Sequence, residues 1–228
     1  PADLKRCDSK IKIIGLDGLL LNGCDAAIAW LNKKIDIKNT IVCPENTYSC
    51  ATAIAVMFLE QKGYAAVTSF TGIGNKAATE QVIMSLHVTE RYMNNREFSG
   101  FAPLKMWLEE VTGNKVPFLA PVIGEKIFHV ESGIHVDGIL KKPANYEPYP
   151  PETVGLERKV VLGKYSGKNS VIIKLKALGL SGHSVYDAEK LLKIIKDRSK
   201  ESCESVSDRE FIQIVKGYDC YEEKVKDC

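Results

Sequence analysis

The sequence lacks the features that mark several classes of protein. Its 228 residues include no block of basic residues and carry a formal net charge of only +2, so nucleic-acid binding is not indicated. No apolar run is long enough to span a membrane, and no signal peptide is recognisable. Internal repeats and low-complexity segments are absent as well. We therefore expect a cytoplasmic globular protein with neither nucleic acid nor membrane among its partners.

Paired cysteines are also missing. The seven cysteines are scattered and include no C-x-x-C pair, which argues against a zinc ribbon and against a disulfide framework. A reduced cytoplasmic setting is the simpler expectation. The hydrophobic content of 45% is ordinary, and a chain of this length can build a packed core without metal or disulfide staples.

Strand and helix patterns alternate in the first part of the chain. Strands are predicted at 12–21 (with the loop that follows), 40–43 and 65–71, and helices at 25–34, 52–62 and 80–86. This alternation indicates parallel β-α units, whose helices cover both faces of the sheet. Three such units are too few to close a (β/α)₈ barrel, which takes about 250 residues.

The second part of the chain has a different pattern. Residues 117–170 are predicted to be irregular, with an extended Pro-Tyr-Pro-Pro stretch at 148–151. Helices are predicted at 101–110, 169–178, 184–196 and from Ser207 to Val215, with Ser184 and Ser207 as candidate N-caps and a loose end at 221–228. We therefore predict two domains, residues 1–98 and residues 99–228.

Titratable residues gather in the middle of the chain, at residues 128–138. This segment holds two of the four histidines, and Gly163-Lys164-Tyr165-Ser166-Gly167 follows after a Pro- and Tyr-rich connection. His135 and Asp137 are two residues apart, so they would share a face on a strand and diverge on a helix. Imidazole suits proton transfer because its pKa lies near neutrality.

Three motifs in this region resemble the homocitrate synthase and isopropylmalate synthase family, and the nitrogen-fixation type of homocitrate synthase looks nearest. They are residues 131–141 (Glu-Ser-Gly-Ile-His-Val-Asp-Gly-Ile-Leu-Lys), 145–155 and 161–167, in the family's order and spacing. The resemblance does not extend to the family's N-terminal half. It implies an α/β fold in which residues 11–86 form the last three β-α units of an incomplete TIM-type barrel, followed by a mostly helical linker region. Roughly the first five strands of the barrel have no counterpart here.

The resemblance implies catalytic roles in the first two motifs. His135 matches the family's Ser-Gly-x-His histidine, which would be a catalytic acid or base, with Glu131 in the same motif. Asp137 would orient His135 or a bound substrate. Tyr146 or Tyr149 would be the family's assisting tyrosine. The alternative for His135 is a buried structural histidine.

Substrate-binding residues are expected beside them. Ser132, Lys164 and Ser166 are candidates for binding a carboxylate or phosphate group, together with Lys168. The alternative for residues 163–168 is a tight turn bounded by glycines, with solvated lysines.

A second candidate site follows the strand at 40–43. Cys43 and Glu45 could point to one side at the C-terminal end of this strand, where β/α enzymes keep catalytic residues. The family has His-x-His here, whose histidines bind a divalent ion, and Cys43 and Glu45 stand in their places. Because thiolate and carboxylate can ligate metals, one hypothesis is a Zn, Mn or Mg site at Cys43 and Glu45. The other is that the metal site is lost.

A glycine-rich segment, residues 71–76, lies after the third predicted strand. It resembles the family's Gly-x-Gly-Glu-Arg turn, with Asn75 in place of the Glu and Lys76 in place of the Arg. The simpler interpretation is a turn that leads into a helix N-terminus, where free N–H groups could still receive an anion.

The family condenses acetyl-CoA with a 2-oxo acid: a metal polarises the carbonyl, a base forms the acetyl enolate, and water hydrolyses the thioester. The resemblance thus implies a C-terminal subunit or fragment of a homocitrate synthase-like acyltransferase, with 2-oxoglutarate the favoured oxo acid. An N-terminal barrel subunit would complete the site in a homo- or hetero-oligomer. The alternative is a catalytically silent structural or regulatory subunit related to isopropylmalate and citramalate synthases.

Overall fold

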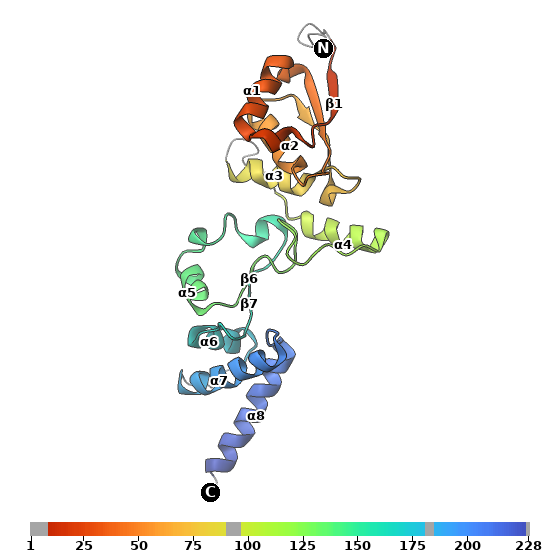
Figure 1. Ribbon diagram of the computed structural model, residues 1–228. Coiled ribbons are helices and arrows are strands. Elements are labelled where there is room, and N and C mark those ends of the chain that lie inside the picture. The colour runs from red at the N-terminus through yellow and green to blue at the C-terminus, as the bar shows by residue number, and fades with distance from the viewer. Residues whose placement is uncertain (1–8, 90–96, 181–184, 227–228) are drawn as a thin grey trace. The chain divides into compact units, whose positions relative to one another are not determined.

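The computed structural model describes residues 9–89, 97–180 and 185–226 (Figure 1). The chain divides into two compact units, residues 1–124 and 125–228, whereas the sequence predicted a division between residues 98 and 99. None of the helices in the described residues is both long enough and apolar enough to cross a membrane.

A three-stranded parallel sheet forms the centre of the first unit. Its strands are β1 (Ile11–Gly15), β2 (Thr40–Pro44) and β3 (Ala65–Ala66), with β2 in the middle. β1 and β2 pair over their full length, from Ile11 opposite Thr40 to Gly15 opposite Pro44. Helices α1 (Cys24–Lys34), α2 (Ala51–Glu60) and α3 (Thr79–Val88) follow in alternation with the strands. The predicted parallel β-α pattern is confirmed, and the sheet is compatible with part of a barrel.

The third predicted strand, residues 65–71, is wrong as a continuous element. It divides into β3 and β4 (Thr68–Ser69), and β4 pairs in parallel with β5 (Ala77–Ala78) in a separate two-stranded sheet. A 3₁₀ helix at Phe70–Gly72 ends the extended segment, and Thr71 inside it has a left-handed backbone with φ of 58°. The backbone therefore turns at the point where the periodicity predicted further strand.

Apolar side chains hold the first unit together on the helical side of its strands. One cluster comprises Leu31, Ile35, Val42 and Phe58, and a second comprises Ala51, Ala55, Ala77, Val82 and Leu86. Helix α4 (Phe101–Thr112) also belongs to this unit, and Gly113 ends it with a left-handed φ of 70°. Glycine adopts that conformation without steric cost, so it suits the end of the helix.

The second unit begins with two short parallel strands, β6 (His129–Val130) and β7 (Lys159–Val160). Between them lie α5 (Gly133–Lys141) and 3₁₀ helices at Pro143–Asn145 and Pro151–Val154. The prediction of an irregular 117–170 region is therefore wrong for α5. The prediction of an extended 148–151 stretch is wrong for Pro151, which opens the second 3₁₀ helix, since proline fits the first helical position.

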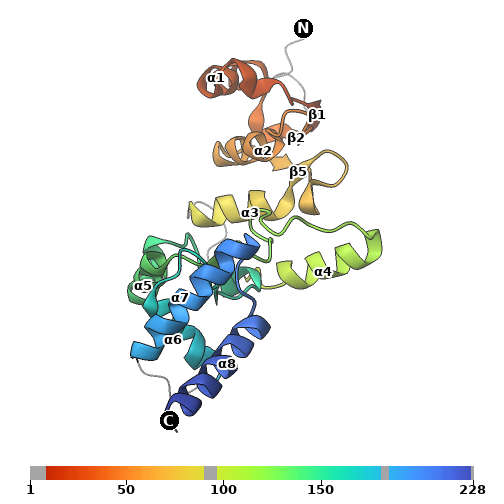
Figure 2. The same cartoon turned by 60° about the horizontal axis from the view of Figure 1, so that its bottom comes forward.

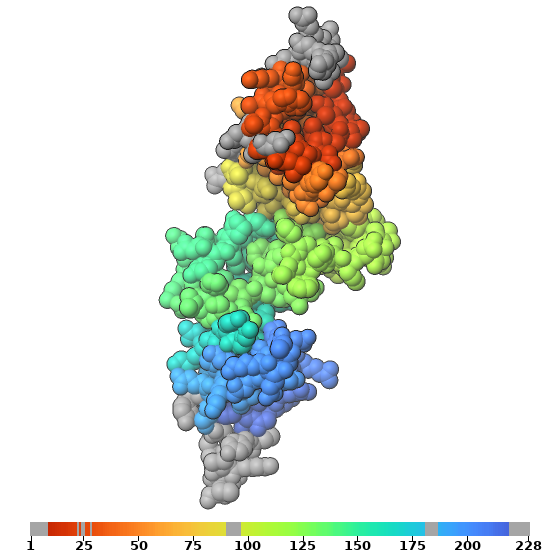
Figure 3. All heavy atoms as spheres, viewed as in Figure 1, coloured from red at the N-terminus to blue at the C-terminus, as the bar shows by residue number. Residues whose placement is uncertain are grey.

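Three helices complete the second unit: α6 (Lys168–Ala177), α7 (Val185–Ser202) and α8 (Asp208–Lys226), which lie side by side in Figures 1 and 2. In the space-filling view the blue atoms of α7 and α8 pack closely (Figure 3). Their shared core includes Leu162, Val171, Leu175, Leu191, Ile195, Val206, Phe211 and Val215.

The predicted caps can be compared with the observed ends of these helices. Ser207 is confirmed as a cap of α8, because its Oγ accepts a hydrogen bond from the backbone N–H of Glu210 at 3.2 Å. Ser184 lies outside the described residues. Helices α7 and α8 both extend beyond their predicted ends, and the backbone of α8 is helical to Lys226 where a loose end was predicted.

Candidate functional site

A half-open cavity of about 290 Å³ lies within the second unit. Its wall comes from β6, α5 and the connection that follows α5. The lining residues are Ile127, Phe128, His129, Val130, Glu131, His135, Ile139, Tyr146, Glu147 and Pro148. Three of the four predicted catalytic residues, Glu131, His135 and Tyr146, thus share one cavity.

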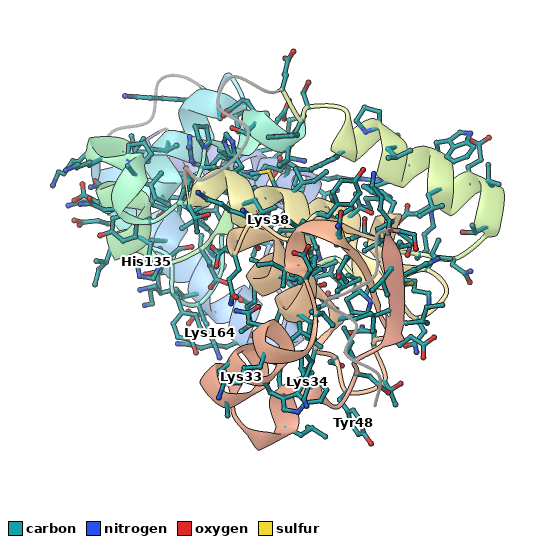
Figure 4. All side chains as sticks on the ribbon, turned by 90° about the horizontal axis from the view of Figure 1, so that it is seen from above. Lys33, Lys34, Lys38, Tyr48, His135 and Lys164 are labelled. Atoms are coloured by element: carbon teal, nitrogen blue, oxygen red, sulfur yellow. The ribbon has the colours of Figure 1, made fainter. Side chains whose placement is uncertain are left out.

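Helix α5 positions His135 at this cavity. Val136 and Ile139 are buried, which fixes the rotation of the helix, and Ile139 lies one turn after His135 on the same side. The His135 side chain is exposed, so the alternative of a buried structural histidine is not what the structure shows. Figure 4 marks His135 at α5. The centroids of the His135 and Tyr146 rings are 5.5 Å apart, with an interplanar angle of 56°.

Gly138 makes room for Tyr146. A Cβ atom at Gly138 would collide with the Tyr146 ring and hydroxyl. The absent side chain therefore allows the phenol to lie directly against α5, beside His135. Tyr149 is placed differently: its ring packs against buried Phe128 at 5.7 Å, and burial raises the pKa of its hydroxyl. Tyr146 is the better candidate of the two.

The predicted orienting role of Asp137 toward His135 does not fit the helix. Each residue turns an α-helix by about 100°, so side chains two residues apart diverge. Asp137 instead forms an exposed ion pair with Lys141, with 2.7 Å between Oδ2 and Nζ, and this hydrogen bond raises the pKa of Lys141. Asp137 is not among the residues that line the cavity.

Glu131 joins the first motif to the third. Its Oε1 accepts a hydrogen bond from the backbone N–H of Tyr165 at 2.9 Å, and its carboxylate lies where a side chain at Gly163 would be. Gly133 and Gly167 approach so closely that a Cβ on Gly133 would lie 2.8 Å from the Cα of Gly167. The two motifs are therefore one folded unit rather than two separate candidates.

The predicted substrate-binding residues lie around this junction. Ser166 is buried, and its Oγ accepts a hydrogen bond from the backbone N–H of Gly163 at 2.9 Å, which indicates a structural part in the turn. Lys164 is exposed, with Nζ 4.7 Å from the centroid of the Tyr165 ring (Figure 4). Lys168 pairs with Glu189 at 2.8 Å. Neither Ser132 nor these residues line the cavity, so their binding roles stay predictions.

Two residues of the cavity were missed by the sequence analysis. Buried Glu147 forms a two-pronged ion pair with Arg158, with both N–O distances at 2.6 Å, and this contact raises the pKa of Arg158. Residues eleven apart cannot meet within one helix or one strand, so only the folded connection reveals the pair. His129 also lines the cavity, and its pKa is lowered by burial and then by the nearby charge of Lys159.

The second candidate site, at the end of β2, has different surroundings. Cys43 is buried, with 3% of its surface exposed. Glu45 is paired with Lys76, with 3.1 Å between Lys76 Nζ and Glu45 Oε1, and Cys43 is close enough to add to the raised pKa of Lys76. Within residues 9–89, 97–180 and 185–226, no group of three or more His, Cys, Asp or Glu side chains could hold a metal ion. The residues present do not fit the divalent ion that the resemblance implied.

The chain is similar to several known proteins. Residues 122–203, which contain the cavity, match the homocitrate synthase post-HMGL domain-like family. The chain is 36% identical over 177 residues to the homocitrate synthase omega subunit of Clostridium pasteurianum, covering 77% of this chain and 49% of that protein. It is 31% identical over 199 residues to homocitrate synthase AksA of Methanothermobacter thermautotrophicus, covering 85% and 50%.

A further relative widens the family. The chain is 34% identical over 137 residues to a probable 2-isopropylmalate synthase of Ignicoccus hospitalis, covering 59% of this chain and 34% of that protein. Together with the joined motifs, these matches show that the chain contains a C-terminal region of the synthase type. The chain belongs to the homocitrate synthase and isopropylmalate synthase family, and it spans about half the length of the two homocitrate synthases.

Proposed function

We propose that residues 1–228 act as the C-terminal part of a homocitrate synthase-like acyltransferase, which condenses acetyl-CoA with a 2-oxo acid, 2-oxoglutarate being favoured. The observation that carries this proposal is the cavity in which His135, Tyr146 and Glu131 meet. Two relatives that are homocitrate synthases support the reaction class.

The cavity combines side chains that can transfer protons with apolar side chains. His135 is an exposed residue that lines the cavity, and imidazole is a side chain that can give or take a proton in catalysis. Tyr146 brings a hydroxyl that can donate to an oxygen of the substrate. Phe128 and Ile139 supply apolar contact. Condensation requires removal of a proton from the acetyl methyl group and protonation of the new alkoxide, and His135 would serve one of these transfers.

The sheet of the first unit supports the proposal that further barrel strands are needed, because one of its edges is β1. β1 is the edge strand of the described three-stranded sheet, and Ile14 in it is 61% exposed. Leu21 and Trp30 are large apolar side chains that are also exposed nearby in the chain. The backbone groups along an unpaired strand edge favour pairing with another strand, and exposed apolar side chains favour contact with a further subunit. We expect an N-terminal barrel subunit to pair along β1 and to complete the catalytic site.

A second candidate function is a catalytically silent structural or regulatory subunit. The contact that favours it is the ion pair between Lys76 and Glu45, because it occupies the residues that stand at the family's metal-binding position. In that case the joined motifs around Glu131 would serve the packing of the second unit alone.

The test is the release of CoA from acetyl-CoA and 2-oxoglutarate by the assembly purified from its own cells, with any subunits that accompany it. We expect turnover by the wild-type assembly and a loss of about 100-fold or more with His135→Ala. Lys115→Ala is the control, since Lys115 is exposed and distant in sequence from the cavity. Undiminished turnover with His135→Ala, or no turnover by the wild-type assembly with any 2-oxo acid, would support the silent subunit instead.

A further inference from the structure

The loop that follows β2 is joined to the loop between β4 and β5 in the first unit. Glu45, just after β2, and Lys76, just before β5, form an isolated antiparallel β-bridge. The backbone N–H of Asn46 donates to the carbonyl oxygen of Asn75 at 3.0 Å. The side chains of Glu45 and Lys76 are also in contact: Lys76 Nζ donates a hydrogen bond to Glu45 Oε1 at 3.1 Å. Backbone and side chains thus hold the loops at 45–46 and 75–76 together.

The ammonium group of Lys76 is paired with the carboxylate of Glu45, with 3.1 Å between Nζ and Oε1. This hydrogen bond is the main cause that raises the pKa of Lys76; burial opposes it, and Cys43 adds to it. Three-quarters of its side-chain surface is covered, since 25% is exposed.

The side chains at the end of β2 do not supply enough ligands for a metal ion. A structural or catalytic zinc site takes at least three protein ligands, and magnesium and manganese prefer six mostly oxygen ligands. Cys43 and Glu45 supply two, and the described residues add no third of these types. A protonated lysine donates only, so Lys76 cannot serve as a ligand and instead competes for both groups.

We propose that Lys76 is a protein-held cation that takes the place of a divalent metal at the end of β2. Its ammonium neutralises Glu45 and fastens the two loops beside buried Cys43, so this end of the sheet needs no metal ion. The inference goes beyond the proposed acyltransferase function and does not depend on turnover.

The test combines metal binding with the accessibility of Cys43. Wild-type protein, Lys76→Met, Lys76→Arg and the control Lys115→Met are treated with a thiol reagent under native conditions, and labelling of Cys43 is followed by peptide mass spectrometry. Lys115 forms an exposed lysine–glutamate pair with Glu109 in the same unit and is a matched control. We expect Lys76→Met to speed labelling roughly tenfold through local opening, Lys76→Arg to restore slow labelling, and Lys115→Met to change nothing.

Each protein is also titrated with Co²⁺ and Zn²⁺. We expect the wild-type protein to show no cobalt–thiolate absorption and no thermal shift with zinc or with a chelator. Stoichiometric zinc binding that is lost in Cys43→Ser would overturn the proposal. Unchanged Cys43 labelling in Lys76→Met would also overturn it, because the loops would then be fastened without the ammonium. Neither readout depends on acyl transfer, so its failure is separate from that of the proposed function.

Discussion

The loops after β2 and the cavity beside α5 both contain residues at positions where the family resemblance places chemistry, but their side chains are used differently. Glu45 is paired with Lys76 within the same unit, and Cys43 beside them is buried. His135 and Tyr146 line an open cavity, where their polar atoms can meet a ligand. A motif position therefore indicates chemistry only when the fold leaves its side chain available.

The largest expected effect comes from the partly buried ion pair beside the cavity. Glu147→Ala would leave Arg158 without its two-pronged partner, and because Arg158 is 31% exposed we expect a loss of about 2 kcal/mol in the free energy of unfolding, less than for a fully buried pair. Denaturant unfolding of the second unit measures this loss. A change no larger than that of Asp137→Ala would contradict the importance given to the pair.

A smaller effect is expected at Gly138. Gly138→Ala favours the helix intrinsically but places a Cβ where the Tyr146 ring lies, so Tyr146 must move from His135. We expect CoA release by the assembly to fall about tenfold while α5 stays folded. Gly217→Ala is the matched control, because its helical position in α8 has open space. Equal activity of the two variants would show that the position of Tyr146 is unimportant.

The pH dependence of the second unit tests His129. Because its folded pKa is lowered, its neutral form is favoured, and its contribution to stability is present above about pH 6.5 and is lost as pH falls through the folded pKa. We expect His129→Gln to lose less thermal stability than the wild type between pH 7.5 and 5.5. An identical loss in both proteins would argue against this coupling.

The smallest effect is expected for Asp137→Ala. Its partner Lys141 is largely exposed, and such a pair one helical turn apart contributes little in water. Thermal unfolding and CoA release should both stay close to the wild type. A large loss of turnover would support the predicted catalytic role of Asp137. It would also show that a side chain engaged in an ion pair can still take part in the reaction.

Local patterns predicted the helices well, and Ser207 capped α8 as expected from its sequence. Distant contacts were not predictable. The pairing of Glu147 with Arg158 depends on how a Pro-rich connection folds back, and that of Lys76 with Glu45 depends on the meeting of two strand ends. Helix α5 was missed within the region predicted to be irregular: Gly133, Gly138 and β-branched residues lower its helix propensity, whereas buried Val136 and Ile139 stabilise it.

The most direct measurement compares two substitutions in one assay of CoA release by the purified assembly: His135→Gln in the cavity and Cys43→Ser at the end of β2. We expect a loss of about 100-fold for His135→Gln and near wild-type turnover for Cys43→Ser. The reverse result, a loss with Cys43→Ser and none with His135→Gln, would place the chemistry at the end of β2 and rule out the cavity beside α5 as the catalytic site.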